Sequence, residues 1–69
     1  MSVTKYYEDR EEAIEAAKDL AGGDASRTVT YKKFQDYEGW TFEVVDIPEG
    51  LFKIAICDDE GYRMHDWSE

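Results

Sequence analysis

Residues 40–57, WTFEVVDIPEGLFKIAIC, decide the fold of this chain. Polar and apolar residues alternate on both sides of the central PEG, a pattern typical of two half-buried strands joined by a tight turn. The apolar side chains expected to share one face are Trp40, Phe42 and Val44 in the first strand and Phe52, Ile54 and Ile56 in the second. The stretch therefore predicts an antiparallel hairpin with strands at residues 40–47 and 51–57.

The same kind of pattern continues on either side of this hairpin. Residues 28–34 are rich in β-forming side chains and predict one strand, and a last strand is expected at residues 62–67. Three short segments that end in glycine, DYEG, PEG and DDEG, separate the strands and predict hairpin turns. This part of the chain thus predicts an antiparallel meander of about four strands.

A helix is expected before the meander. Asp9, followed three residues later by Glu12, is typical of a capping box, and Gly22 and Gly23 are typical of a helix end. Between these signals, small and apolar residues recur at helical spacing: Ala13, Ile14, Ala17, Leu20 and Ala21. Because this stripe is mostly alanine, the helix is expected to lie close against the surface that it covers.

These elements predict one small α+β domain over residues 1–69. The helix is expected to cover one face of the meander, and residues 3–7 are expected to add a short strand at an edge of the sheet. No repeat or low-complexity linker indicates a domain boundary. A chain of this length has a thin core, because a domain near 60 residues buries only about 60% of its unfolded surface.

The composition is strongly acidic, with 17 Asp and Glu against 8 Lys and Arg and a formal net charge of -9. Such a charge disfavours nucleic acid and anionic membranes as partners and favours a basic protein surface. The 42% hydrophobic and 14% aromatic residues are too many for a disordered acidic tail. The chain has one cysteine, no apolar run near 20 residues and no secretory pattern at its N-terminus. These features indicate that the protein is located in the reducing cytoplasm.

Catalysis is not expected from this inventory. The one cysteine and the one histidine, Cys57 and His65, are the only pair that would form a nucleophilic dyad. If DDEG is a hairpin loop, Cys57 pairs beside Tyr62 and His65 lies opposite Ile54, so more than one cross-strand step separates the two side chains. No phosphate-binding loop, serine elbow or zinc-like cluster is present, and no cofactor is expected.

The acidic loop at residues 58–60, with Asp66 on the following strand, raises the question of a calcium site. A calcium-binding EF-hand needs a loop of twelve residues, whereas this loop has about four. A solvated turn is the better interpretation, and no metal is expected.

Acidic residues recur on one side of the expected helix. Four of them follow each other at intervals of three or four residues, with a fifth beside them: Glu8, Glu11, Glu15 and Asp19, flanked by Glu12. Successive members stand about 5 to 6 Å apart, which resembles the charges along one nucleic-acid strand in sign and rough spacing. A solvated helix face and adaptation to high salt are the alternative explanations.

Aromatic residues favour binding, because ten of them exceed what one thin core hides. Tyrosine and tryptophan dominate interface hot spots and contact arginine well. Several lie beside acids in the expected turns and near the end of the chain. These aromatic residues, the acids beside them and the acidic loop give the further candidate partner-binding residues: Tyr37, Glu38, Asp58, Asp59, Glu60, Asp66 and Trp67.

The whole chain resembles the small acidic inhibitors that phages encode against host defences, the anti-CRISPR and DNA-mimic proteins. The resemblance rests on size, on charge and on the helix REEAIEAAKDLAGG placed before strands. It implies a non-enzymatic inhibitor that occupies the DNA-binding surface of a nuclease or CRISPR complex in the host cytoplasm. These inhibitors share no sequence signature, so no residue role is carried over.

The sequence therefore predicts an acidic DNA mimic that binds the basic surface of a CRISPR effector complex or another DNA-binding enzyme. The alternative is a small accessory interaction module that uses an aromatic face or a sheet edge, with the charge serving solubility alone. Salt distinguishes the two, because ionic contacts weaken as salt rises. The oligomeric state stays open, since either edge strand can pair with a copy of itself.

Overall fold

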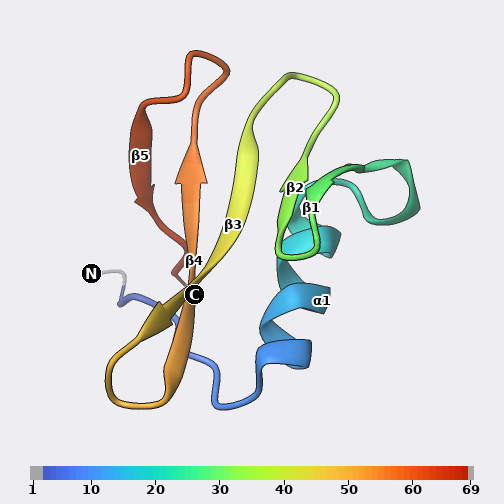
Figure 1. The fold of residues 1–69 in the computed structure, drawn as a ribbon. Helices are drawn as coiled ribbons and strands as arrows, with labels where there is room; N and C mark the ends of the chain where they lie inside the picture. The colour runs from blue at the N-terminus through green and yellow to red at the C-terminus, as the bar shows by residue number, and fades with distance from the viewer. Residues whose placement is uncertain (1–2, 69) are drawn as a thin grey trace.

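A computed structural model describes residues 3–68 of the chain, and the side chains of all of these except residues 63 and 64. An α-helix, α1 (Arg10–Leu20), lies across one face of a five-stranded antiparallel sheet (Figure 1). The strands follow each other in sequence order across the sheet: β1 (Arg27–Thr30), β2 (Lys33–Gln35), β3 (Thr41–Ile47), β4 (Leu51–Cys57) and β5 (Arg63–Asp66). The predicted α+β class and the meander are confirmed, with one strand more than expected.

The additional strand arises because residues 28–34 do not form one strand. The chain turns back at Tyr31 and Lys32, so that β1 and β2 pair with each other and Thr28 lies opposite Phe34. A bulge interrupts this pairing just before the turn. The prediction of one strand was wrong because this turn contains no glycine, proline or asparagine that would mark it in the sequence.

The helix begins and ends close to the predicted signals. The Asp9 carboxylate accepts a hydrogen bond of 3.0 Å from the backbone N–H of Glu11, which confirms Asp9 as the N-cap. At the other end α1 stops before Gly22, whose φ of 121° favours glycine. A short 3-10 turn, Gly23–Ala25, then leads into β1.

The core lies between α1 and the three strands that it covers, β2, β3 and β4. Val44 and Ile54 are fully buried on the central strands, as the alternating pattern predicted. On the helix Ala13 and Ala17 are fully buried, and their small side chains let the helix approach the sheet closely. Burying a large aliphatic side chain stabilises the fold by about 1.5 to 3 kcal/mol, so these few residues carry much of the stability.

Residues 3–7 form isolated bridges rather than the predicted edge strand. Tyr7 and Phe52 exchange two backbone hydrogen bonds of 2.8 and 2.9 Å, and Thr4 forms a bridge with Ser68. The backbone N–H of Lys5 donates to the carbonyl of Trp67 at 2.8 Å. The segment therefore joins β4 to the C-terminal end of the chain and does not add a regular strand.

The pairing of β4 with β5 also differs from the prediction. His65 lies opposite Ile56 rather than Ile54, and Cys57 lies opposite Arg63. The pairing is already one residue from the prediction at Cys57, next to the turn, and a register shift between Ile56 and Cys57 adds the second residue at His65.

The helices have no membrane-spanning character: none within residues 3–68 is long and apolar enough to cross a bilayer.

Candidate functional site

Two turns at the same end of the sheet have the same sequence pattern and the same hydrogen bonds (Figure 1). They are residues 36–40, DYEGW, and residues 58–62, DDEGY, and we call them together the twin-turn tip. In the first turn, Oδ1 of Asp36 accepts from the backbone N–H groups of Glu38 and Trp40 at 3.0 and 2.9 Å. In the second, Oδ1 of Asp58 accepts from Glu60 and Tyr62, at 3.0 Å each.

The backbone closes both turns identically. The N–H of the aspartate donates to the carbonyl of the aromatic residue four positions later, at 2.9 Å in each turn. The glycines have positive φ values, 97° at Gly39 and 89° at Gly61. No internal repeat was expected, yet the pattern D-x-E-G-aromatic occurs twice in the sequence and is the signal for this pair of turns.

The two turns lie against each other at one point. A Cβ atom on Gly39 would stand 3.0 Å from the Cβ of Asp59, so the close approach requires glycine here. Around this contact two tyrosines of the tip are exposed to solvent. Tyr37 is 94% exposed and Tyr62 is 69% exposed. The exposed acids of the tip are Glu38, Asp59 and Glu60.

The structure assigns different roles to the predicted residues of this tip. Tyr37, Glu38, Asp59 and Glu60 are exposed, as a binding role requires. Asp58 instead uses a carboxylate oxygen to hold its own turn, so its first role is structural. The tip thus presents acids and tyrosines together on two turns that internal hydrogen bonds hold in shape.

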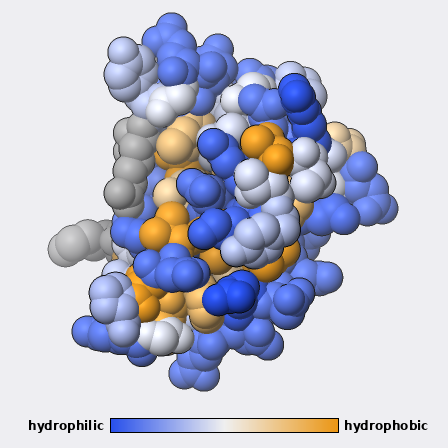
Figure 2. All heavy atoms as spheres, in the orientation of Figure 1, coloured by the Kyte–Doolittle hydropathy of each residue, from blue (hydrophilic) through white to orange (hydrophobic). Residues whose placement is uncertain are grey.

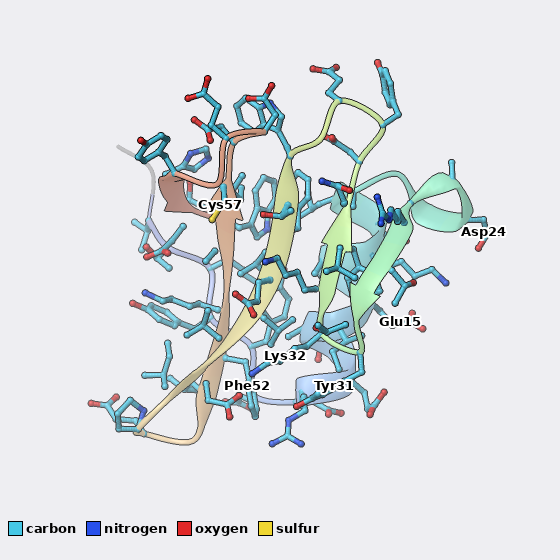
Figure 3. All side chains as sticks on the ribbon, turned by 45° about the horizontal axis from the view of Figure 1, so that its top comes forward. Glu15, Asp24, Tyr31, Lys32, Phe52 and Cys57 are labelled. Atoms are coloured by element: carbon cyan, nitrogen blue, oxygen red, sulfur yellow. The ribbon has the colours of Figure 1, made fainter. Side chains whose placement is uncertain are left out.

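The predicted acidic row lies on the solvent side of α1. All of its members are exposed, whereas the buried residues of α1 are Ala13 and Ala17. The members are Glu8, Glu11, Glu12, Glu15 and Asp19, which we call the acidic helix face. Glu8 precedes the N-cap, so the regular helical spacing begins at Glu11. Glu15 projects outward from α1 in Figure 3.

Position along the helix divides these acids into two groups. Glu11 and Glu12 lie in the first turn, where the helix dipole favours negative charge. Glu15 and Asp19 lie further along, and Asp19 is in the last turn, where a carboxylate opposes the dipole. Neither Glu15 nor Asp19 has a side-chain ion pair within the described residues, so no ion pair there accounts for their presence.

Lys18 follows Glu15 by three residues on α1 but forms no ion pair with it. Its ion pair is instead with Asp24 of the 3-10 turn, at 3.9 Å and with both side chains well exposed. Such exposed pairs contribute little to stability. The acidic helix face therefore keeps its negative charge.

Asp66 and Trp67 differ from the other predicted binding residues. Asp66 is half-buried and its carboxylate lies 3.0 Å from the ammonium of Lys53, with both side chains 21% exposed. Trp67 is half-buried and packs against the core. Both side chains hold the C-terminal end of the chain in place, so neither belongs to the exposed candidate surface.

Cys57 and His65 lie on adjacent strands but do not pair. His65 faces Ile56 across the ladder, and consecutive residues of a strand project to opposite faces. The pairing places the side chains of Cys57 and His65 on opposite faces of the sheet. The described residues enclose no pocket, and among them no three Cys, His, Asp or Glu side chains lie close enough to hold a metal ion.

The surface in Figure 2 is mainly hydrophilic, with small apolar areas between charged side chains. The exposed large hydrophobic side chains are Val3, Tyr6, Val29, Tyr31, Tyr37 and Tyr62, and most of them are tyrosines. This confirms that the aromatic residues exceed the capacity of the core.

Comparison with protein-family models, with curated proteins and with solved structures found no match.

Proposed function

We propose that this chain is a non-enzymatic protein that binds the basic, nucleic-acid-binding surface of another protein and competes there with DNA. The observation that carries the proposal is the placement of Glu15 and Asp19 on the acidic helix face. Both are exposed, and neither has a side-chain ion pair within the described residues. Asp19 moreover opposes the helix dipole. Carboxylates without an ion pair in their own fold are free to contact cations of a partner.

The spacing of the row suits a surface that normally holds phosphates. Between Glu11 and Asp19 the helix rises about 12 Å, at about 1.5 Å per residue. A duplex carries one phosphate per about 3.4 Å of its axis on each strand, so a length of about 12 Å corresponds to three or four phosphates of one strand. The carboxylates of α1 act as phosphate substitutes in this proposal.

The twin-turn tip supplies a second contact. Its tyrosines offer rigid area that pairs well with arginine, and its acids add charge. Charge accelerates the encounter between the two proteins, while aromatic contacts slow their separation. Tyr37 and Tyr62 therefore contribute to the lifetime of the complex, and Glu38, Asp59 and Glu60 contribute to its rate of formation.

The resemblance to anti-CRISPR and DNA-mimic inhibitors suggests the class of partner. A CRISPR effector complex or another DNA-binding enzyme of the host cytoplasm presents the basic groove that this surface fits. The separation of Cys57 from His65 across the sheet supports a role without catalysis.

Capture from bacterial lysate tests the proposal. The protein is immobilised at low salt, and bound proteins are eluted first with duplex DNA and then with sodium chloride. We expect a nucleic-acid-binding protein or complex in the DNA eluate. A partner that ignores both DNA and salt contradicts the proposal.

Two charge-reversed variants make the capture specific to the helix face. Glu15→Lys/Asp19→Lys changes the proposed contact, and Asp46→Lys/Glu49→Lys changes two exposed acids near the β3–β4 turn. Both variants have a net charge of -5, since each raises -9 by four. We expect the first to lose the partner and the second to retain it. Equal loss in both shows that overall charge alone governs binding.

A small accessory module that binds through tyrosines is the second candidate function. The observation that favours it is the 94% exposure of Tyr37, which contributes nothing to the core. A complex of this kind hardly responds to salt and loses affinity in Tyr37→Ala. The salt dependence of the captured complex therefore separates the two functions.

A further inference from the structure

One segment of this acidic protein is basic. Residues 25–35, which we call the basic hairpin, contain Arg27, Lys32 and Lys33 and no acidic residue. The chain as a whole has a net charge of -9, so the residues outside the hairpin carry -12. The hairpin comprises β1, β2 and the turn between them, at the edge of the sheet (Figure 1).

The three cations of the basic hairpin have no ion pair among the described residues. Lys53 pairs with Asp66 and Lys18 pairs with Asp24, whereas Lys32 lies 6.0 Å from the ring centroid of Tyr31. Figure 3 shows Tyr31 and Lys32 together at the hairpin turn. These positive charges are therefore available to a partner, as the negative charges of the acidic helix face are.

The strand that borders the hairpin is open to solvent. All four residues of β1 are exposed, and within the described residues β1 pairs with β2 alone. An open edge presents unpaired backbone groups, and proteins commonly cover such an edge with a helix. The helix α1 of the same chain covers β2, β3 and β4 and leaves β1 uncovered.

The basic hairpin and the acidic helix face match in length. From Arg27 to Thr30, β1 spans about 10 Å at about 3.3 Å per residue, and Lys32 lies just beyond its end. From Glu11 to Asp19, α1 rises about 12 Å at about 1.5 Å per residue. Cations at both ends of β1 thus find carboxylates at a corresponding separation on a helix laid along it.

We propose that α1 of a second copy of this chain docks along the basic hairpin, so that the acidic helix face of one molecule contacts Arg27 and Lys32 of the other. Net charges of the same sign oppose this approach at long range. At about 0.15 M ionic strength the Debye length is about 8 Å, so the distant charges are screened while direct ion pairs are screened much less. Association is therefore strongest near physiological salt.

The inference does not require the proposed function, although it uses the same helix face. A copy bound to α1 would exclude a basic partner, so self-association limits the fraction of molecules that bind. The experiment below uses purified protein alone, and its result is independent of any captured partner.

Sedimentation equilibrium tests the inference over a range of protein concentration and salt. The monomer has a mass of 8.0 kDa. We expect a larger weight-average mass near 0.15 M salt than at about 0.01 M or about 1 M, where the Debye length is about 30 Å or 3 Å. A mass of 8.0 kDa under all conditions overturns the inference. The cations of the basic hairpin then serve to prevent pairing of the open strand edge with another chain.

Two variants with opposite effects on net charge identify the contact. Arg27→Glu/Lys32→Glu lowers the net charge to -13, and Glu15→Lys/Asp19→Lys raises it to -5. We expect each alone to weaken association by about tenfold or more, because each places like charges in contact. An equimolar mixture should associate again, since the reversed helix then meets the reversed hairpin.

The control is Asp46→Lys/Glu49→Lys, which also has a net charge of -5. If net repulsion alone limited association, both -5 variants would associate more strongly than the wild type. The proposed contact instead predicts loss in the helix variant and retention in the control. Association that persists in Arg27→Glu/Lys32→Glu, or a mixture that stays monomeric, overturns the inference.

Discussion

The twin-turn tip and the acidic helix face use their carboxylates in opposite ways. In the tip, Asp36 and Asp58 each accept two backbone hydrogen bonds and fix the shape of a turn. On the helix face, Glu15 and Asp19 have no side-chain partner among the described residues. The net charge of -9 is thus the sum of acids that build the fold and acids that are left for contacts with other molecules.

The local partner decides the role of an acid in this protein, rather than its exposure alone. Asp58 and Asp59 are adjacent in one turn, yet only Asp58, at the first position of the turn, accepts backbone hydrogen bonds from the residues ahead of it. The fold therefore depends on particular aspartates and tolerates changes at the glutamates.

The largest effect on stability is expected at Asp36. Asp36→Ala removes the acceptor for two N–H groups, one of them on the half-buried Trp40, and should cost about 2 kcal/mol. Asp58→Ala should cost less, about 1 kcal/mol, because both of its donors are exposed. Urea unfolding measures both values.

Two controls make this test sharper. Asp36→Asn keeps an oxygen acceptor and should retain most of the stability. Asp59→Ala alters an exposed acid of the same tip and should be nearly neutral. If Asp36→Ala were as stable as Asp59→Ala, the distinction between the two kinds of carboxylate would not hold.

The contact between the two turns predicts an intermediate effect. Gly39→Ala and Gly61→Ala both place a side chain at positive φ, which costs about 1 to 2 kcal/mol. Gly39→Ala also brings a Cβ to 3.0 Å from Asp59, whereas a Cβ on Gly61 meets nothing within 4 Å. We expect Gly39→Ala to be the more destabilising of the two by urea unfolding.

A double-mutant cycle with Asp59→Gly isolates this contact. Removing the Cβ of Asp59 should reduce the cost of Gly39→Ala and leave the cost of Gly61→Ala unchanged. Additive effects in both pairs would show that the two turns do not constrain each other.

The smallest effect on stability is expected at the acidic helix face. Glu15→Lys/Asp19→Lys places cations in the second half of α1, where the dipole favours them, so the free energy of unfolding should stay the same or rise by a few tenths of a kcal/mol. Urea unfolding with circular dichroism measures this. A decrease of more than about 1 kcal/mol in the free energy of unfolding would show that these acids stabilise the fold.

The sequence predicted the parts of the fold in which local patterns and tertiary contacts agree. The strand Leu51–Cys57 has the predicted limits, because polar and apolar residues alternate along it and a glycine-containing turn lies on each side. The β1–β2 turn was missed since Tyr31 and Lys32 are ordinary strand residues. The β4–β5 register was wrong because a bulge leaves no mark in the residue pattern.

The candidate surfaces were predicted to different degrees. Helical periodicity was enough to place Glu11, Glu15 and Asp19 on one exposed side. The approach of Gly39 to Asp59 was not accessible from the sequence, because it depends on two turns that the meander brings together. The repeated D-x-E-G-aromatic pattern, with the aspartate at the first position of each turn, is the sequence signal for the structural role of Asp58.

The most direct test of the central claim is the salt dependence of affinity for the captured partner. The dissociation constant is measured from about 50 to 200 mM salt for the wild type, Glu15→Lys/Asp19→Lys and Asp46→Lys/Glu49→Lys. We predict a steep loss of affinity with salt for the wild type and the control, and weak binding with a shallow slope for the helix variant. Equal slopes and affinities for all three proteins would contradict the claim that the acidic helix face binds the partner.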